Sequence, residues 1–185
     1  MNSDDELYTA FLAGDMSAAD ALMLKYTGRL IMYADAIIHD IRDAEDLVID
    51  AFAALLTKRP AIREGGFQAY LYRTVRNRAY RFSLVRRRMR IFSLEEECAE
   101  ELLAARPEDD FLRDERRQAV QRCLNRINPE YREAIWLIYF EGLSYAETAA
   151  VLGVNVKRVD NLLTRGKKNL KAELEKEGIT RADES

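Results

Sequence analysis

Residues 142–170 read GLSYAETAAVLGVNVKRVDNLLTRGKKNL, a pattern that predicts two short helices joined by a tight turn. Ser144 and Glu147 have the spacing of a capping box, so the first helix is expected to begin directly after Ser144. Gly153 supplies the turn, because glycine adopts a left-handed conformation at little cost. Asn155 is a good N-cap for the second helix. The stretch therefore has the form of a helix-turn-helix.

The second helix of this pair has two chemically different faces. The residues expected to pack, by the 3.6-residue period, are Val156, Val159, Leu163, Gly166 and Leu170. The opposite face carries Arg158, Asn161 and Arg165, flanked by Lys157 and Lys168. A helix that is anchored on one side and presents such residues on the other suits the major groove of DNA. An ordinary helical hairpin with a solvated basic face is the alternative that this stretch alone leaves open.

Composition narrows the fold class and the cellular setting. The chain has 185 residues, of which 48% are hydrophobic and 33% charged, with only three Pro and eight Gly. These values favour an all-helical protein of one large or two small domains. No signal peptide and no apolar run of about 20 residues is found, so we expect no membrane insertion. Cys98 and Cys123 match no metal-binding spacing, so we expect no metal, no cofactor and a reducing cytoplasm.

The net charge of −3 hides a strong segregation of charge along the chain. Residues 65–94 contain eight Arg and no acid, whereas residues 95–115 contain ten acids and two bases. A polyanion responds to the local patch more than to the total charge. An acidic protein with separate basic stretches is therefore expected to need a partner in order to bind DNA.

Periodicity and capping residues predict that the rest of the chain is helical as well. A long helix is expected over about 16–39, with Leu24 on its apolar face, and Asp43 is the expected cap of the next helix. A further helix begins at Pro129 and is expected to have Tyr139 in its core. We therefore expect an all-α fold of two small helical domains. Their predicted bounds are 1–92 and 108–178, with a short acidic linker at 93–107 and a polar tail at 179–185.

Acidic residues gather near the start of the helix that follows Asp43. Asp46 and Asp50 are four residues apart, so they share an outer face, and Glu45 lies beside them. Acids are also routine at a helix N-terminus, because the helix dipole favours them there. The pattern leaves two interpretations open, a binding face and ordinary capping chemistry.

Residues 67–92 are predicted to form a long basic helix in which aromatic residues and arginines alternate. Aromatic rings can stack on unpaired bases while Arg neutralises phosphates, a combination expected of single-strand binding. The alternative is an amphipathic helix whose aromatic residues belong to the core, and Leu71, Val75 and Ala79 fit that alternative by periodicity. The absence of any compensating acid favours a nucleic-acid surface.

Two separated parts of the chain resemble one family, the bacterial RNA polymerase sigma factors of the extracytoplasmic-function (ECF) group. The segments DAEDLVIDAF (43–52) and AYLYRTVRNRA (69–79) are similar to region 2 of that group. The segment INPEYREAIWLIYFEGLSYAETAAVLGVNVKRVDNLL (127–163) resembles region 4. The resemblance covers about 20–92 and 112–172, in the order expected of the family. It implies promoter recognition without catalysis, with a −35 duplex bound by region 4 and a −10 element melted at region 2.

The resemblance also implies partners and site residues. The partners are core RNA polymerase, promoter DNA and a separate anti-sigma protein. The residues implied at the clamp helices of core polymerase are Asp43, Glu45, Asp46, Leu47 and Asp50. Those implied at the opened −10 element are Arg73, Asn77, Arg81, Arg86, Arg87 and Arg88. Those implied at the −35 element are Ser144, Lys157, Arg158, Asn161, Arg165 and Lys168.

Two other classes of protein explain part of the sequence. An ordinary helix-turn-helix transcription regulator accounts for 144–170 but gives no role to the acidic face or to the basic helix at 67–92. A helical interaction protein, such as a sigma-binding adaptor, is the other alternative. An enzyme is not expected, because His39 is the only histidine and no glycine-rich phosphate-binding loop is found.

Overall fold

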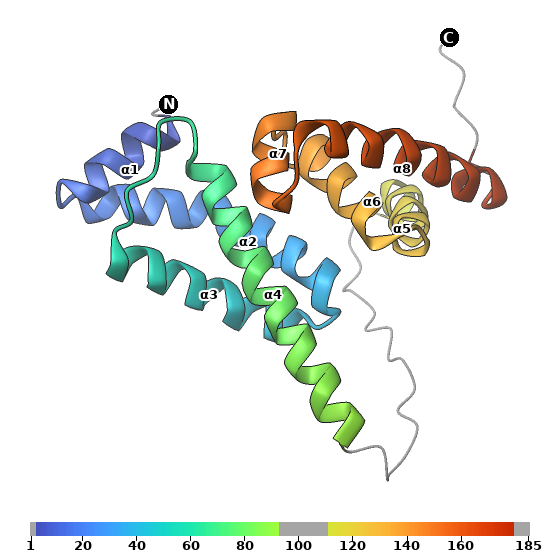
Figure 1. The fold of residues 1–185 in the computed structure, drawn as a ribbon, viewed down its shortest axis with the longest axis horizontal. Coiled ribbons are helices and arrows are strands. Elements are labelled where there is room, and N and C mark those ends of the chain that lie inside the picture. Colours follow the sequence, from blue (N-terminus) through green and yellow to red (C-terminus); the bar gives the residue numbers. More distant parts are fainter. Residues whose placement is uncertain (1–2, 93–110, 180–185) are drawn as a thin grey trace.

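The computed structural model describes residues 3–92 and 111–179, and none of these residues lies in a strand (Figure 1). The all-helical prediction is confirmed. The first group of helices, which we call the N-terminal bundle, consists of α1 (Asp4–Leu12), α2 (Met16–Ile38), α3 (Ile41–Lys58) and α4 (Phe67–Phe92). The second, the C-terminal bundle, consists of α5 (Phe111–Arg126), α6 (Pro129–Ile135), the π-helical turn η1 (Trp136–Phe140), α7 (Tyr145–Leu152) and α8 (Val156–Lys176). The predicted linker at 93–107 lies outside the described residues, and no described helix meets the length and hydropathy needed to cross a bilayer.

Local capping fixes where the helices of the N-terminal bundle begin. Ser3 forms a capping box at the start of α1, and Asp15 caps α2. The expected cap of α3 was wrong: Asp40 is the N-cap, and its carboxylate accepts hydrogen bonds from the backbone N–H groups of Arg42 and Asp43. Asp43 lies in the first turn instead, where the helix dipole still favours an acid.

The core of the N-terminal bundle is built around α2, which contacts α1, α3 and α4. Its largest buried side chains are aromatic, and they include Phe11, Tyr26, Tyr33, Phe52, Phe67 and Tyr72. Leu24, expected on the packed face of α2, is instead 88% exposed. The packed face is shifted around the helix, because the rings of Tyr26 and Tyr33 occupy it and Leu24 lies to the side.

In the C-terminal bundle the helix-turn-helix has the predicted caps. Ser144 and Glu147 form the capping box of α7, Gly153 ends that helix in the left-handed conformation (φ 70°), and Asn155 caps α8. The packed face of α8 is made of Val159, Leu162, Leu163 and Gly166. Val156, which was expected on that face, is 48% exposed, since a residue in the first turn extends beyond the partner helices.

Gly166 lets α8 approach α6 closely. A Cβ atom added at this position would lie 3.1 Å from both Ile135 Cδ1 and Tyr131 Cβ. A residue with a Cβ would require these neighbours to move by a few tenths of an ångström. The glycine is thus favoured by packing, with no special backbone conformation.

The π-helical turn changes which residues of the next segment are buried. Because η1 widens the helix, Tyr139 and Phe140 turn outward, and they are 55% and 50% exposed. The expectation that Tyr139 belongs to the core was therefore wrong. Glu141, at the end of the turn, is directed inward and buried. Single π-helical turns of this kind are frequent at functional sites.

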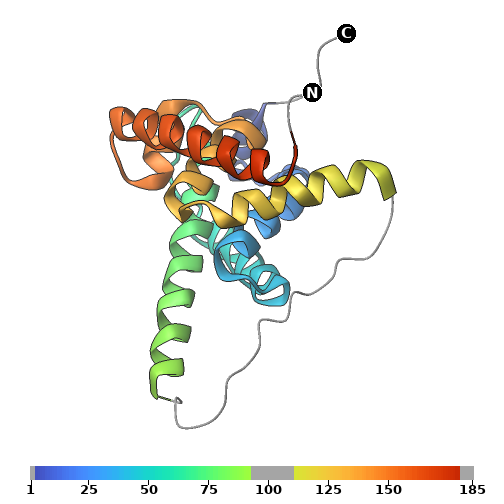
Figure 2. The same cartoon turned by 90° about the vertical axis from the view of Figure 1, so that its right-hand side faces the viewer.

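The two bundles pack directly against each other. The main contact between elements joins α4 to α7, and both bundles contribute to one continuous hydrophobic cluster. Figures 1 and 2 show α4 crossing the contact and then projecting beyond the rest of the molecule at its C-terminal end. The middle of α4 is therefore covered, and its last turns are open to solvent.

Candidate nucleic-acid and protein interfaces

The outer side of α3 presents three acidic side chains to solvent. Glu45, Asp46 and Asp50 are exposed, and we call them the acidic face. Ile49 lies among them and is 61% exposed. Ile49 was not predicted at this surface. Its position, four residues after Glu45 and three after Asp46, would have placed it on the same side of the helix. The exposed isoleucine is the apolar member of a side of α3 that is otherwise acidic.

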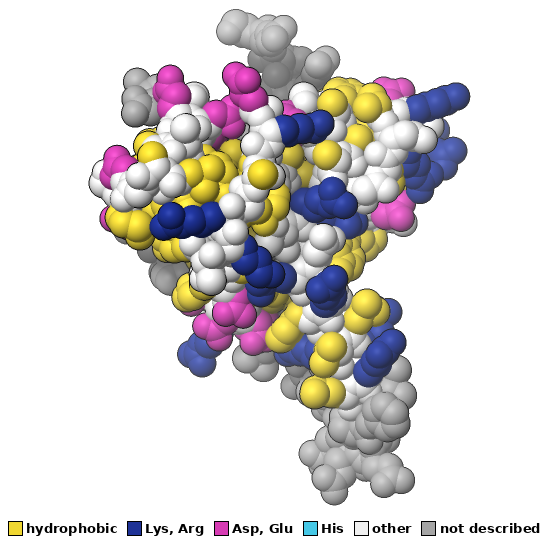
Figure 3. Space-filling model, turned by 60° about the vertical axis from the view of Figure 1, so that its left-hand side comes forward, with side chains coloured by type: hydrophobic (Ala, Val, Ile, Leu, Met, Phe, Trp, Pro, Cys, Tyr) yellow, Lys and Arg dark blue, Asp and Glu magenta, His cyan; other side chains and the backbone are white. Residues whose placement is uncertain are grey.

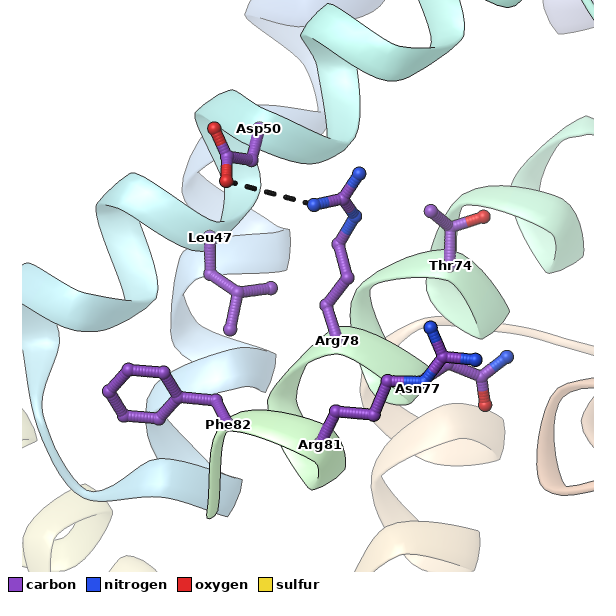
Figure 4. Close-up of a pocket in the computed structure, with 7 residues that line it drawn as sticks. All are labelled: Leu47, Asp50, Thr74, Asn77, Arg78, Arg81 and Phe82. Atoms are coloured by element: carbon purple, nitrogen blue, oxygen red, sulfur yellow. Dashed lines mark ion pairs between the residues drawn. The ribbon is translucent and has the colours of Figure 1, made fainter. Parts of the chain in front are cut away.

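Leu47, predicted at the same surface, is positioned differently. It is buried, with 8% of its surface exposed, and belongs to the core of the N-terminal bundle. It lines a hollow between α3 and α4 with Asp50, Thr74, Asn77, Arg78, Arg81 and Phe82 (Figure 4). The structure thus brings residues predicted for polymerase binding next to residues predicted for DNA binding.

Ion pairs connect the acids of α3 with the basic helix α4. Arg86 lies 3.2 Å from a carboxylate oxygen of Asp43 and 3.7 Å from one of Asp40. Arg78 lies 3.7 Å from Asp50, an interaction drawn in Figure 4. These pairs are solvent-accessible, so each contributes little to stability. Their consequence is that Asp43 and Arg86, predicted for different partners, are paired with each other in the free protein.

Three of the predicted −10 residues form a row along α4. Arg73, Asn77 and Arg81 are spaced by four residues and are all exposed. Arg87 and Arg88 lie farther along the helix and are also exposed. The projecting end of α4 carries hydrophobic as well as basic side chains (Figure 3), among them Leu84, Val85 and Met89. This end offers both cations for phosphates and apolar groups for unstacked bases.

The aromatic residues of α4 divide between core and surface. Phe67 and Tyr72 are buried, as the amphipathic alternative expects, together with Leu71, Val75 and Ala79. Tyr70, Tyr80 and Phe82 are half-buried. The regular alternation of aromatic residues and Arg therefore does not become a regular stacking surface, because the 3.6-residue period sends its members to different sides of the helix.

The basic face of α8 is open to solvent along its length. Lys157, Arg158, Asn161, Arg165 and Lys168 are all exposed. Arg158 donates a hydrogen bond to Glu130 at 2.9 Å, in an ion pair whose two side chains are each about half exposed or more. Ser144 is exposed as well, but its hydroxyl accepts the backbone hydrogen bond of the capping box.

Lys167 was not predicted at this surface. Its ammonium lies 5.0 Å from the centre of the Tyr139 ring, and its pKa is raised by the hydrogen bond and the charge of that tyrosine. The π-helical turn, which carries Tyr139 outward, creates this contact. Sequence periodicity gives no signal for it, because the register changes within the turn.

Two buried carboxylates at the contact between the bundles were also missed. Glu133 of α6 and Glu141 are each 6% exposed, and both accept hydrogen bonds from side chains of the N-terminal bundle. The sequence alone does not distinguish these two acids from the exposed acids of a helix. Only the position of the second bundle shows that they are internal.

Protein-family models match two parts of the chain. The model described as Sigma-70 region 2 matches residues 22–91, and that described as Sigma-70, region 4 matches residues 117–170. The first match lies within α2–α4, where the acidic face and the basic helix are found. The second match contains the helix-turn-helix.

Curated relatives extend the similarity over most of the chain. The chain is 30% identical over 181 residues to the ECF RNA polymerase sigma factor SigE of Mycolicibacterium smegmatis, covering 94% of this chain and 70% of the relative. It is 29% identical over 173 residues to the RNA polymerase sigma-H factor of Pseudomonas aeruginosa, covering 89% and 90% of the two chains.

Solved structures share the arrangement of helices. The sigma factor RpoE of Bartonella quintana, crystallised in complex with the anti-sigma factor NepR, is 26% identical, with a TM-score of 0.66 over 84% of this chain and 96% of that one. CnrH, solved with the cytosolic domain of CnrY, is 23% identical with a TM-score of 0.67, covers 94% of this chain and 98% of that one, and supports the fold alone.

Proposed function

The chain belongs to the ECF group of sigma-70 factors, non-catalytic proteins that bind core RNA polymerase and direct it to promoters, and on that premise we propose how its surfaces share this task. The N-terminal bundle contains the region 2 match and the C-terminal bundle the region 4 match. The acidic face of α3, with Ile49, binds core polymerase. The row on α4 and its projecting end bind the opened −10 element, and the basic face of α8 reads the −35 element.

The observation that carries this proposal is the presence of three exposed surfaces on one chain: the acidic face of α3, the row and projecting end of α4, and the basic face of α8. An ordinary helix-turn-helix regulator requires the basic face of α8 and leaves the acidic face and the projecting end of α4 without a role. Phosphate contacts fix the position of a protein on DNA, whereas contacts to base edges specify the sequence. The −35 duplex therefore positions the protein, and the −10 strand is held after its bases unstack.

The deciding experiment is transcription with purified components. The protein should make core RNA polymerase initiate at a defined start site on promoter DNA without any other sigma factor. A requirement for another sigma factor would support the class of ordinary regulators instead.

We further propose that the protein acts in the cytoplasm. A separate anti-sigma protein is its expected regulator, in view of the complex in which the Bartonella RpoE was solved.

Removal of arginines from the projecting end of α4 should change the salt dependence of promoter opening. Arg87 and Arg88 are exposed, whereas Arg86 is paired with Asp43. Arg87→Ala with Arg88→Ala should reduce the slope of log K against log salt by about 0.7–0.9 for each lost phosphate contact. Arg86→Ala should change the slope less. The measurement is open-complex formation between 50 and 200 mM salt, a range over which roughly 1000-fold effects can arise. An unchanged slope in the double variant would exclude phosphate contacts by these two residues.

Substitutions on α8 should separate base recognition from phosphate binding. Asn161 lies in the middle of the basic face, and an Asn favours adenine when it makes two hydrogen bonds to the base edge. Asn161→Ala should relax the preference at one or two −35 positions, with a loss of about 1–3 kcal/mol of discrimination. Lys168→Ala, the matched variant on the same helix, should weaken all sequences about equally. A −35 library selected with each mutant holoenzyme gives the result. Recovery of the wild-type motif at every position with Asn161→Ala would contradict the assignment.

A further inference from the structure

One cation on the basic face of α8 differs from the others in having a carboxylate partner. Among the residues that the structure describes, Arg158 alone of these cations forms an ion pair, in which its Nη2 donates to Glu130 Oε2 at 2.9 Å. Glu130 lies in the first turn of α6, 28 positions earlier in the chain, so the pair joins two helices. The direction of the Arg158 side chain is therefore set by a neighbouring helix and not by α8 alone.

Helix capping fixes the backbone on both sides of this pair. Asn155, the N-cap of α8, accepts a hydrogen bond from the backbone N–H of Arg158 at 2.8 Å. Asn128, the N-cap of α6, accepts one from the backbone N–H of Glu130, also at 2.8 Å. The two helices pack directly against each other (Figure 1). Because neither backbone is free to shift, the ion pair selects the side-chain conformations that keep the guanidinium beside α6.

Arg158 is the first of three residues that form a row along α8. Arg158, Asn161 and Arg165 are three and four positions apart, so they lie on one side of the helix, and all three are exposed. In helix-turn-helix proteins the N-terminal residues of the second helix contact base edges in the major groove. Arg158 is thus at the end of the row that enters the groove, and Glu130 lies beside that end.

A guanidinium held by one carboxylate keeps donors for DNA. It has five N–H groups, and the contact with Glu130 is made through Nη2. An arginine reads guanine through two hydrogen bonds, one to O6 and one to N7. The remaining N–H groups of Arg158 are sufficient for this contact. A side chain that is already held in place also loses less conformational entropy on binding than a free one.

The same pair opposes binding to DNA of arbitrary sequence. A phosphate contact by Arg158 requires its guanidinium to leave Glu130, which then remains as an unpaired negative charge beside the DNA. At a guanine the ion pair is kept, and it becomes stronger as the DNA excludes water from it. An element that weakens the wrong complex more than the right one increases specificity.

We infer that Glu130 is a positioning residue for −35 recognition, which orients Arg158 toward a guanine and restrains it from binding the phosphates of other sequences. The inference rests on the proposed function, in which the basic face of α8 reads the −35 element. Glu130 acts through Arg158 and makes no base contact of its own. The −35 position that Arg158 reads is a guanine, the base that arginine contacts most often.

Selection of a −35 library with each mutant holoenzyme tests this inference. Glu130→Gln removes the charge and keeps the size of the side chain. It should weaken the preference for guanine at one position by about two- to fivefold, the range measured for exposed ion pairs. Binding of the same holoenzyme to a duplex without a promoter should become tighter. Its slope of log K against log salt should steepen by about 0.9, because the freed Arg158 then contacts one further phosphate.

A double-mutant cycle shows whether the effect passes through Arg158. Arg158→Ala alone should abolish the guanine preference, and Glu130→Gln should change the motif no further in that background. Glu130→Asp keeps the charge in the first turn of α6 but shortens its reach, so it should lower the guanine preference as Glu130→Gln does. The control is Glu175→Gln, which breaks the exposed ion pair of Glu175 with Lys171 at the other end of α8 and should leave the motif and the salt slope unchanged.

The outcomes separate the role of Glu130 from the proposed function. A wild-type guanine preference in Glu130→Gln would overturn the inference, and so would a change of preference that persists without Arg158, since Glu130 would then read the base itself. Either result leaves the reading of the −35 element by α8 intact, because Arg158→Ala and Asn161→Ala test that reading independently. A −35 motif that no substitution on the basic face alters would instead overturn the assignment of α8 in the proposed function.

Discussion

Charge reversal of Asp46 and Asp50 together should weaken binding to core RNA polymerase by about 100-fold, which corresponds to roughly 2.7 kcal/mol. Both carboxylates are exposed on α3, and they flank the exposed side chain of Ile49. An acidic surface with an apolar centre is complementary to a basic surface with an apolar groove. Placement of like charges opposite each other in such an interface costs several kcal/mol. The expected readouts are loss of co-purification with core polymerase and loss of initiation.

The matched control is Asp20→Arg with Glu175→Arg. It makes the same change in net charge at two exposed positions outside the acidic face. This control should bind core polymerase as the wild type does, with only a small general effect on binding to DNA. Asp50 also forms a long ion pair with Arg78, which already offsets part of its charge. Asp46→Arg alone should therefore cause most of the loss of affinity for core polymerase. Equal affinity of the double variant and the control for core polymerase would show that α3 is not the docking surface.

Substitution of Gly166 by leucine should overpack the C-terminal bundle at a cost of about 3 kcal/mol, at the upper end of what overpacking commonly costs. The new side chain would enter the contact between α8 and α6, where a Cβ alone lies 3.1 Å from Ile135 Cδ1 and from Tyr131 Cβ. The gain in helix propensity recovers at most about 1 kcal/mol. A net loss near 2 kcal/mol should lower the melting temperature of this bundle by about 10 °C.

The chain offers a built-in probe and a matched glycine for this measurement. Trp136, the only tryptophan, lies in the C-terminal bundle next to Ile135, so its fluorescence reports the unfolding of that bundle. Gly28→Leu is the control, because Gly28 lies in the middle of α2 with no atom within 4 Å of an added Cβ. It should keep or slightly raise the melting temperature. Equal effects of the two substitutions would mean that the approach of α6 and α8 does not depend on Gly166.

The sequence by itself determined the helices and most of their beginnings. The capping box at Ser144 and the left-handed turn at Gly153 were predictable, because each depends on residues within four positions of one another. The family resemblance added the order of the two DNA-binding parts and the separate polymerase-binding part. The cap of α3 was misplaced by three residues, because Asp40 and Asp43 both have a carboxylate in a suitable position and the chain geometry selects between them.

The tertiary structure decided which side of each helix faces another helix. The exposure of Leu24 and the burial of Tyr72 depend on the direction from which neighbouring helices approach. Hydrophobic periodicity shows that a helix has a packed face, but it leaves the rotation of that face about the helix axis uncertain by about one residue. The burial of Glu133 and Glu141 depends on the contact between two bundles, and the hydrogen-bonded partners lie 53 to 112 positions apart along the chain. Local sequence carries no information on such a distant pairing, because an acid that binds water and an acid that binds a remote arginine have the same neighbours along the chain.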